Sequence, residues 1–509
     1  MKKILQLIFH RVVIGAVLML LQLALLVLMM VEFQKYFVYF YAICTVISIL
    51  VTLYLVNNNH TNPAYKIAWM IPILLVPVFG GLFYIVGRPR ISRRQRERMS
   101  GMAGNFSHID PGASEPLAKL QQENPSAAGQ SRYIERCGYC PPYENTTVEY
   151  LPLGEVKFER MLTELKAAKK FIFLEYFIIQ EGKMWDPILE ILEQKVKEGV
   201  EVRVMYDDFG CMMTLPARYW GTLEKKGIQC CVFNPFVPVL SLRFNNRDHR
   251  KICVIDGWVG ITGGINLADE YINEKQRFGY WRDTGVRLEG PAAWSFTTMF
   301  LEFWAANRPE SDERAVPRPV FASPAPGATG LVQPFCDTPV DDETIAKNVY
   351  LELINQAQRE LFITTPYLIL ENDLLTALCL AAKRGVDVRI YTPGIPDKPT
   401  IFQLTRSYFP ALINGGVKVY SFTPGFLHSK TWYCDGRIGA VGSINLDYRS
   451  LYLHFECSTL LYGGEALQDI RADMMDLESQ CHRVELSDCR TSWLGTLVSA
   501  VLRLVAPLC

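Results

Sequence analysis

Two copies of one short motif carry the side chains best suited to chemistry. Both copies have the spacing H-x-K-x4-D, and their residues are, in chain order, His249, Lys251 and Asp256, then His428, Lys430 and Asp435. The chain has only 7 histidines, so chance poorly explains why two of them open these copies. We interpret the copies as two contributions to one catalytic site.

The residue types of the motif suit phosphodiester chemistry. An imidazole can attack phosphorus when it is neutral and can protonate a leaving alkoxide when it is charged. One histidine cannot do both at once, but two can act on opposite sides of a phosphodiester. The motif lysines would surround the non-bridging oxygens, where negative charge develops. Three side chains that follow the motifs complete the predicted phosphate-binding set, namely Asn266, Ser443 and Asn445. No metal and no cofactor are therefore expected.

Each motif is predicted to lie on a β-hairpin. Residues 251–255 and 430–434 have the composition of short strands, on which a histidine and a lysine two positions apart point to the same face. Asp256-Gly257 and Asp435-Gly436 then form tight turns. The returning strand would place the Gly-Gly or Gly-Ser pair and the asparagine beside the histidine. Asp256 and Asp435 complete the catalytic motif, but their place beside turn glycines indicates that they hold the hairpin rather than contact the substrate.

The motifs and their flanks resemble those of the phospholipase D superfamily and, within it, the bacterial cardiolipin synthases. The resemblance runs from about Tyr133 to the C-terminus, and two positions depart from the usual pattern: Asp248 and His454 stand where an asparagine is more common. Neither departure removes a motif residue. The segments that carry the resemblance are NRDHRK (246–251), TGGIN (262–266), WRDT (281–284), FLHSK (426–430), GSINLD (442–447) and FE (455–456).

The resemblance implies a fold and a reaction. The fold would be two phospholipase D-type α/β sandwich halves meeting at a pseudo-twofold active site, with His249 and His428 facing each other. The reaction would join two phosphatidylglycerol molecules into cardiolipin and glycerol through a phosphatidyl-histidine, with His249 as nucleophile by family habit. A phospholipase D or another phosphatidyltransferase remains the nearest alternative. A membrane-tethered nuclease is less favoured because the sequence shows no basic groove interleaved with aromatic residues. The formal net charge of zero also argues against a bulk nucleic-acid binder, which would normally be basic. A non-catalytic scaffold would have no chemical reason to keep both motifs.

Two further acids are expected to orient the histidines. Asp283 and Glu456 lie 34 and 28 positions beyond the histidines of their own halves, on apolar strands where a carboxylate is costly unless it is paired. We assign Asp283 to Nδ1 of His249 and Glu456 to Nδ1 of His428, so that each fixes a tautomer. A surface or salt-bridged acid is the alternative. A single histidine on an apolar strand is usually a hydrogen-bonded core residue, so His454 is not counted.

An internal repeat supports the duplicated architecture. The first half is predicted to run helix 158–170, strand 171–179, helix 188–198 and strand 200–206. The second half repeats the order at 341–358, 361–370, 374–384 and 386–391. The segment KEGVEVR (197–203) also matches KRGVDVR (383–389). A helix, a glycine stop and an apolar strand are typical of an open α/β sheet that is covered on both faces.

The N-terminus has the composition of a membrane anchor. Residues 12–31 and 37–56 are apolar runs long enough to cross a bilayer as a helical hairpin, and residues 67–86 form a third or re-entrant segment broken by prolines. A cleaved signal peptide is the alternative for the first run. Basic residues before the first run and at 88–98 favour the cytoplasm. We therefore expect a multi-pass protein of the bacterial cell membrane with a cytoplasmic catalytic region and with phosphatidylglycerol and anionic lipids as partners.

The predicted organisation assigns 1–91 to the anchor, 92–132 to a linker, 133–308 to the first half, 309–330 to a second linker, 331–485 to the second half and 486–509 to a C-terminal apolar helix. That helix would either pack on the enzyme or lie in the membrane interface. The 14 cysteines have no even spacing, which favours a reducing compartment. Cys137 and Cys140 form a lone C-x-x-C that is more typical of a loop than of a metal or redox site. The sequence does not determine the oligomeric state.

Overall fold

The computed structural model describes residues 37–58, 62–77, 115–235, 246–308, 327–341 and 343–508, with a few isolated positions outside these ranges. The chain divides into two compact units. The small unit comprises Met1–Ser92, Asn234–Asn246 and Ala500–Cys509, and the large unit comprises Arg93–Phe233 and Arg247–Ser499. Both motifs lie in the large unit.

The first half of the large unit is built on a seven-stranded sheet with the order β1-β9-β7-β6-β2-β3-β4. Strands β2, β3 and β4 are parallel, and β6, β7, β9 and β1 continue the sheet in antiparallel pairs. The bounds are β1 Thr147–Leu151, β2 Phe171–Tyr176, β3 Glu201–Asp207, β4 Gln229–Phe233, β6 Lys251–Ile255, β7 Val259–Gly263, β9 Gly285–Glu289, α9 Gly154–Ala167, α10 Trp185–Lys197, α11 Asp208–Cys211, α12 Tyr219–Lys225, η3 Asp269–Ile272 and α13 Ala293–Asn307.

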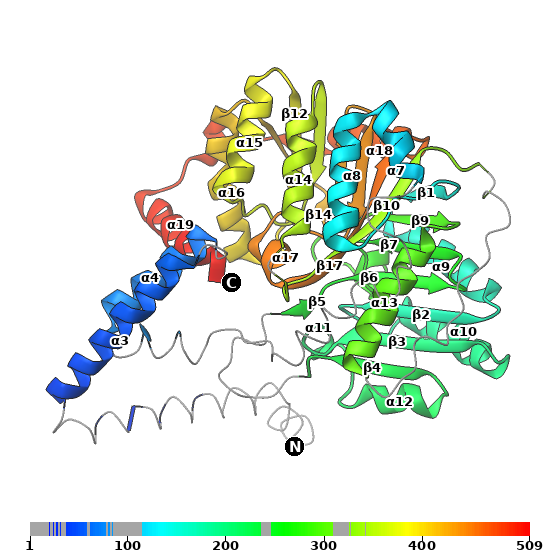
Figure 1. Ribbon diagram of the computed structural model, residues 1–509, viewed down its shortest axis with the longest axis horizontal. Coiled ribbons are helices and arrows are strands. Elements are labelled where there is room, and N and C mark those ends of the chain that lie inside the picture. The colour runs from blue at the N-terminus through cyan, green and yellow to red at the C-terminus, as the bar shows by residue number, and fades with distance from the viewer. Residues whose placement is uncertain are drawn as a thin grey trace. The chain divides into compact units, whose positions relative to one another are not determined.

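The second half repeats this plan. Its main sheet has the order β10-β17-β16-β15-β11-β12-β13-β18, and Figure 1 shows α14, α15 and α16 on this half. The bounds are β10 Leu331–Asp337, β11 Glu360–Thr364, β12 Asp387–Pro393, β13 Lys418–Phe422, β15 Thr431–Cys434, β16 Ile438–Gly442, β17 His454–Tyr462, β18 Cys481–Arg483, α14 Ile345–Gln356, α15 Asn372–Lys383, α16 Pro399–Asn414, α17 Tyr448–Tyr452 and α18 Ala466–Ser479.

The prediction of duplicated α/β halves is confirmed. The order α9, β2, α10, β3 recurs as α14, β11, α15, β12, and the matched heptapeptides end a helix and open a strand in both halves. At the stop between them Gly199 and Gly385 have φ of +86° and +97°, a left-handed conformation that glycine adopts without strain.

The strands are apolar because both sheet faces are covered. In β2, Phe173 stacks on Phe300 of α13 with ring centroids 4.7 Å apart. The alternating residues Ile172 and Leu174 instead belong to a core with Met161 of α9. This two-sided burial accounts for the continuous apolar runs of the central strands.

Two short strands join the halves, because each comes from one half and pairs with a strand of the other. Strand β5 (Arg247–Asp248) comes from the first half but pairs in parallel with the start of β17 in the second. Strand β14 (Gly425–Leu427) comes from the second half and pairs in parallel with β8 (Tyr280–Arg282) of the first. We call β5 and β14 the crossed arms. Each ends one residue before a motif histidine, so each histidine is carried to the opposite half.

The prediction that residues 92–132 form a linker fails for the second part of that range. Helices α7 (Glu115–Glu123) and α8 (Pro125–Gly138) lie there, and the predicted start of the first half falls inside α8. This helix packs on the second half, where the Gln130 Nε2 amide donates to the Val349 carbonyl at 3.0 Å. The polar composition hid the helix, whose Asn124 N-cap and buried Ala127 and Ala128 give it a start and an apolar face.

The two ends of the chain contain further helices. Helix α3 (Phe37–Asn57) coincides with the second predicted apolar run, and α4 (Pro63–Leu75) overlaps the third. The first run, 12–31, lies almost wholly outside the described residues. None of the helices in the described part of the chain meets both the length and the hydropathy required of a membrane span. The C-terminal segment contains η5 (Leu486–Cys489), α19 (Trp493–Val505) and η6 (Ala506–Leu508) rather than one helix.

Candidate active site

The crossed arms place the two motif histidines in matching surroundings. The backbone N–H of His249 donates to the carbonyl of Phe455 at 2.9 Å, and that of His428 donates to the carbonyl of Arg282 at 2.7 Å. Each histidine therefore extends the strand pairing of its arm by one residue. Both rings are buried, with at most 8% of either residue exposed, as expected for groups that react away from bulk water.

The histidine-orienting acids are paired across the halves, not within them. His249 Nδ1 lies 2.9 and 3.0 Å from the two carboxylate oxygens of Glu456, and His428 Nδ1 lies 2.6 Å from Asp283 Oδ2. Each acid therefore lies at an Nδ1 atom, but at that of the other half's histidine and not of its own as we expected, and its role in orienting that histidine stays a prediction. The cause is the crossing of the arms, which brings each histidine to the other half's acidic strand.

The residues that hold the two acids differ. Ser443 Oγ donates to Glu456 Oε2 at 2.5 Å and accepts the Cys457 N–H at 3.1 Å. At the matching position, a Cβ on Gly264 would lie 2.2 Å from Asp283 Oδ1, which no real side chain tolerates. Ser443 was predicted to bind phosphate, whereas its contacts show it bonded to an orienting acid.

The motif lysines lie under the histidines. Lys251 Nζ donates to the His249 carbonyl, and Lys430 Nζ donates to the His428 carbonyl and lies 2.9 Å from His428 Nδ1. Burial lowers the pKa of Lys251 to about 8 and, together with the charge of Lys251, the pKa of Lys430 to about 7. Asp283 and Glu456 oppose these shifts only in part, and a bound phosphodiester would add a negative charge that favours the charged forms of both lysines.

The same burial acts on the imidazoles. It lowers the pKa of His428 to about 4, with the neighbouring Lys430 adding to the effect. Burial and then the charges of Lys251 and Lys430 hold the pKa of His249 well below its usual range. Both imidazoles are therefore neutral near pH 7 before an anion enters, and a neutral imidazole is the nucleophilic form.

The two asparagines are not equivalent. Asn266 Oδ1 accepts the Ile178 N–H at 3.1 Å, and its Nδ2 donates to the Tyr271 hydroxyl at 2.6 Å. Asn445 is also buried, but its Oδ1 has no hydrogen-bond partner within the described part of the chain. Phosphate binding by these side chains stays a prediction, and it would have to use the Nδ2 donors, of which that of Asn266 already donates to Tyr271.

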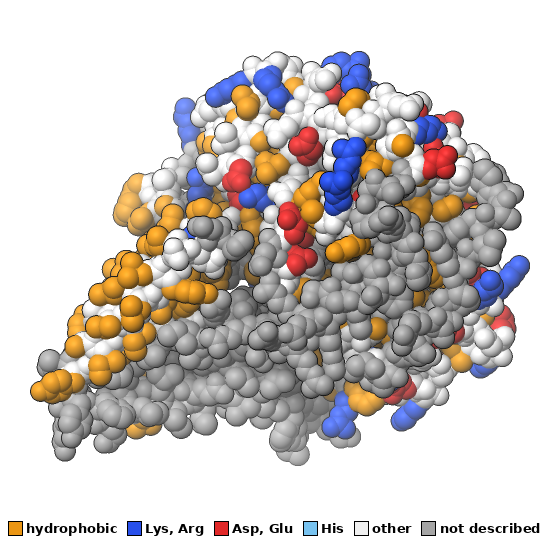
Figure 2. All heavy atoms as spheres, viewed as in Figure 1, with side chains coloured by type: hydrophobic (Ala, Val, Ile, Leu, Met, Phe, Trp, Pro, Cys, Tyr) orange, Lys and Arg blue, Asp and Glu red, His pale blue; other side chains and the backbone are white. Residues whose placement is uncertain are grey.

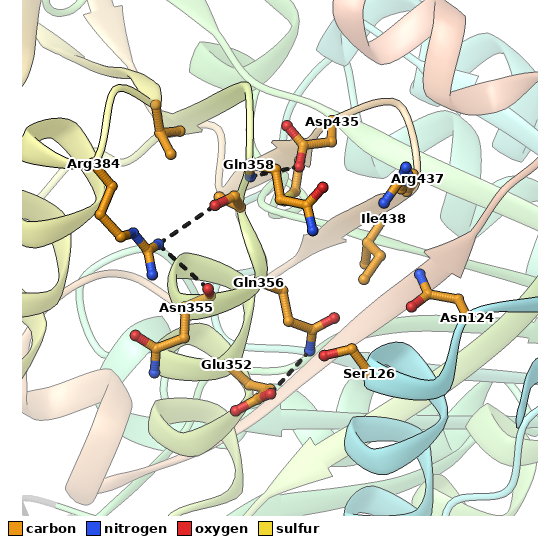
Figure 3. Close-up of a pocket in the computed structure, with 13 residues that line it drawn as sticks. Asn124, Ser126, Glu352, Asn355, Gln356, Gln358, Arg384, Asp435, Arg437 and Ile438 are labelled. Carbon is orange, nitrogen blue, oxygen red and sulfur yellow. Dashed lines mark hydrogen bonds between the residues drawn. The ribbon is translucent and has the colours of Figure 1, made fainter.

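Asp256 and Asp435 bind the backbone next to the motif hairpins and do not lie at the histidines. Both have φ near +55°, and Figure 3 shows Asp435 beside Gln358 in the wall of a cavity of about 510 Å³ that Arg384 and Arg437 also line. No motif histidine lines that cavity. Each carboxylate accepts three consecutive backbone N–H groups, from Lys169, Lys170 and Phe171 for Asp256 and from Gln358, Arg359 and Glu360 for Asp435.

Two residues of the site were not found from the sequence. Tyr271 lies edge-on to the His428 ring with centroids 5.5 Å apart. Lys157 is fully buried in α9, where burial lowers its pKa to about 8 although the charge of Asp283 opposes this. A signal for Lys157 existed, since it precedes the buried Met161 and Leu165 at four-residue spacing and so occupies a core position of the helix.

One group of side chains in the described residues could hold a metal ion. The ligand atoms of His249, His454 and Glu456 lie within 4.8 Å of one another. In the structure His249 Nδ1 and the Glu456 carboxylate are already joined by hydrogen bonds. That the reaction needs no metal stays a prediction.

Comparison with known proteins identifies the family. The model described as "Cardiolipin synthase, PLD-like domain" matches residues 161–279 and 350–477. A cardiolipin synthase of Halalkalibacterium halodurans is 33% identical over 472 residues, which cover 91% of this chain and 92% of that protein. The chain belongs to the cardiolipin synthase family.

Other similarities agree with this membership. The model described as "Phospholipase D-nuclease N-terminal" matches residues 39–88. A cardiolipin synthase of Geobacillus kaustophilus is 34% identical over 442 residues, covering 85% of this chain and 86% of that one. The crystal structure of a phosphatidylserine synthase from Haemophilus influenzae has a TM-score of 0.53 at 16% identity, covering 71% of this chain and 94% of that one. At that identity it supports the fold alone.

Proposed function

We propose that this enzyme transfers a phosphatidyl group from one phosphatidylglycerol to another, forming cardiolipin and glycerol. The observation that carries the proposal is the pair of buried histidines, each with Nδ1 on a carboxylate and with a lysine beneath it. The family membership supports the lipid substrate class. The choice of phosphatidylglycerol as both donor and acceptor is part of the proposal.

In the first step His249 Nε2 attacks phosphorus. The bound phosphodiester anion raises the pKa of His428, which takes up a proton on Nε2. The P–N bond forms as the P–O bond to the donor's glycerol breaks, and the protonated His428 gives this Nε2 proton to the departing oxygen. The contacts of Glu456 and Asp283 with the Nδ1 atoms leave the Nε2 atoms for this exchange. The assignment of His249 as nucleophile follows family habit.

In the second step His428 accepts the proton of an acceptor hydroxyl. That oxygen attacks phosphorus, the P–N bond breaks, and His249 is released neutral. Negative charge on the equatorial oxygens is met by Lys251 and Lys430, whose charged forms the phosphate itself favours. If the hydroxyl belongs to a second phosphatidylglycerol the product is cardiolipin, and if it is water the product is phosphatidic acid.

The proposal includes anchoring in the bacterial cell membrane with a cytoplasmic catalytic region. Figure 2 shows apolar side chains gathered along α3 and α4, and Ile43 and Leu53 of α3 are each 60% exposed. Helix α19 has a second apolar face, with Trp493, Leu497 and Val501 all more than half exposed. We assign α19 to the membrane interface, where such a helix lies with its apolar face in the acyl chains.

The function is tested by lipid analysis. The wild-type gene expressed in a bacterium that lacks cardiolipin should restore it, and His249→Ala and His428→Ala should each fail, as should the double variant. Purified enzyme in phosphatidylglycerol vesicles should release one glycerol per cardiolipin. Excess glycerol should reverse the reaction, because donor and product contain the same kind of bond. Phosphatidic acid as the dominant product without cardiolipin would instead identify a phospholipase D.

A further inference from the structure

The residues two positions before the two orienting acids occupy equivalent places. Trp281 precedes Asp283 and pairs with Phe426 of one crossed arm, while His454 precedes Glu456 and pairs with Arg247 of the other. The Trp281 ring lies 5.3 Å from His428 at 46°, and the His454 ring lies 5.4 Å from His249 at 44°. The two sites therefore share geometry but not chemistry.

The hydrogen bonds of His454 fix its tautomer. Arg449 Nε donates to His454 Nε2 at 3.3 Å, so Nε2 is the acceptor and the ring proton is on Nδ1. Nδ1 lies 3.6 Å from Glu456 Oε1 and has no hydrogen-bond partner among the described residues. The N–H therefore faces the carboxylate that holds His249, slightly beyond hydrogen-bond length.

The ring of His454 is neutral at working pH. Only 9% of the residue is exposed, and burial, with the positive charge of Arg449 nearby, lowers its pKa to about 3 although Glu456 opposes this. It therefore acts through the dipole of its N–H bond and not as a cation. In the other half the Trp281 indole packs against Tyr271 and Phe426, and its Nε1 has no partner in the described chain.

We propose that His454 is a positioning residue for His249: its Nδ1–H, aimed by Arg449, steadies the Glu456 carboxylate against the His249 ring. Glu456 then has three groups directed at it, the Ser443 hydroxyl, the His249 N–H and the His454 N–H. A carboxylate that shares its charge among more donors attracts a protonated His249 less strongly. His454 thereby favours the neutral, attacking form of His249, and the two pseudo-equivalent histidines become chemically distinct.

The test compares the pH dependence of phosphatidyl transfer in four enzymes. These are the wild type, His454→Ala, His454→Asn and the control His482→Ala, which alters an exposed histidine bonded to Asp488. Loss of the donor should strengthen the hold of Glu456 on protonated His249. The acidic limb of the kcat/KM profile in His454→Ala should therefore move to higher pH, and kcat should fall about fivefold. His454→Asn, whose Nδ2–H₂ replaces the donor, should restore both, and His482→Ala should match the wild type.

An unshifted acidic limb in His454→Ala would overturn the proposal. It would also be overturned if His454→Asn, with a melting temperature equal to that of the wild type, failed to restore the profile. The inference rests on the proposed function only through this activity measurement. A titration of ¹⁵N-histidine-labelled enzyme by NMR provides an independent readout. The His249 resonances, identified by their loss in His249→Ala, should titrate at higher pH in His454→Ala than in the wild type. A titration identical in both proteins would refute the positioning role even if transfer itself were never observed.

Discussion

At the scale of single residues, the two halves hold their acids by opposite means. Asp283 lies so close to the Gly264 backbone that any side chain would displace it, whereas Glu456 is held by the Ser443 hydroxyl. Position 264 therefore requires the absence of a side chain, and position 443 requires a donor.

This difference predicts unequal effects of substitution. Gly264→Ala should move Asp283 away from His428 and lower kcat about 100-fold or more, while Ser443→Ala should remove one donor and lower kcat about tenfold. Transfer rates in phosphatidylglycerol micelles measure both. Gly221→Ala is the control, because a Cβ there meets nothing within 4 Å. A Gly264→Ala enzyme as active as this control would show that Asp283 does not need its close approach.

The buried cations predict proton uptake when a phosphodiester binds. Lys430 and Lys251 have pKa values near 7 and 8 in the free enzyme, and an anion between them favours their charged forms. Binding a phosphonate analogue of phosphatidylglycerol at pH 7.5 should therefore take up at least one proton, as measured by calorimetry in buffers of different ionisation enthalpy. Lys430→Arg should take up fewer, because a guanidinium is already charged. Proton release would contradict this account of the site.

Sequence reasoning at this scale found the groups but not all their partners. The motif residues and both orienting acids could be recognised because their types and spacing repeat. The pairing of Glu456 with His249 could not, since it depends on which half each arm crosses to. The bond from Ser443 to Glu456 was missed for a related reason: a hydroxyl near a phosphate site can bond either to substrate or to a buried acid, and the sequence does not give the position of Glu456.

At the scale of elements, the motif hairpins were predictable and the crossed arms were not. Strands β6 and β15 have the apolar runs and turn glycines that identify a strand, and the structure places them within one residue of the predicted bounds. The arms β5 and β14 have two and three residues, too few for any periodicity. Their pairing joins residues far apart in the chain, such as Arg247 with His454 for β5 and Gly425 with Tyr280 for β14.

Asp256 and Asp435, whose carboxylates bind backbone N–H groups beside the motif hairpins, predict unequal losses of unfolding free energy when they are replaced. Asp435 is 5% exposed and bonds three backbone N–H groups, so Asp435→Ala should lower the unfolding free energy by about 2 kcal/mol. Asp256 makes the same three bonds in a more exposed setting, and water can replace part of what Asp256→Ala removes. Melting temperatures should therefore fall more for Asp435→Ala than for Asp256→Ala, with exposed Glu190→Ala unchanged. The reverse order would contradict the role of burial.

At the scale of the whole molecule, composition predicted the duplicated enzyme but misjudged a connecting segment. Polar and small residues made 92–132 resemble a linker, yet α8 packs against α14 and β10 of the second half, where Gln130 donates to Val349 and Gln333 donates to the Ser131 carbonyl. Burying a helix with few large apolar residues is possible when its alanines allow close approach. Composition alone cannot distinguish that case from a flexible connection.

Helix α19 is the second feature of the whole molecule to consider, because it concerns how the enzyme contacts a lipid bilayer. In α19 the residues Trp493, Leu497 and Val501 follow one another at four-residue spacing, so they share one face of the helix. None of the residues of α19 is buried, and the helix contains no acidic side chain. Its C-terminal continuation, η6, packs on α4 within the small unit. An apolar face without acids, leading into a unit of exposed apolar helices, suits a bilayer of anionic phospholipid.

This assignment predicts where photo-crosslinks form. Enzyme carrying benzoylphenylalanine in place of Leu497 and reconstituted in phosphatidylglycerol vesicles should give phospholipid adducts on irradiation, detected by mass spectrometry of the α19 peptide. The same probe in place of Thr496, which lies about 100° around the helix from Leu497 and is also exposed, should give at least several-fold fewer. Both enzymes should keep their transfer activity, so a loss of adducts cannot be ascribed to a damaged site. Adducts from position 497 to protein rather than lipid would show that α19 covers another surface of the chain or of a second copy, and would contradict its assignment to the membrane interface.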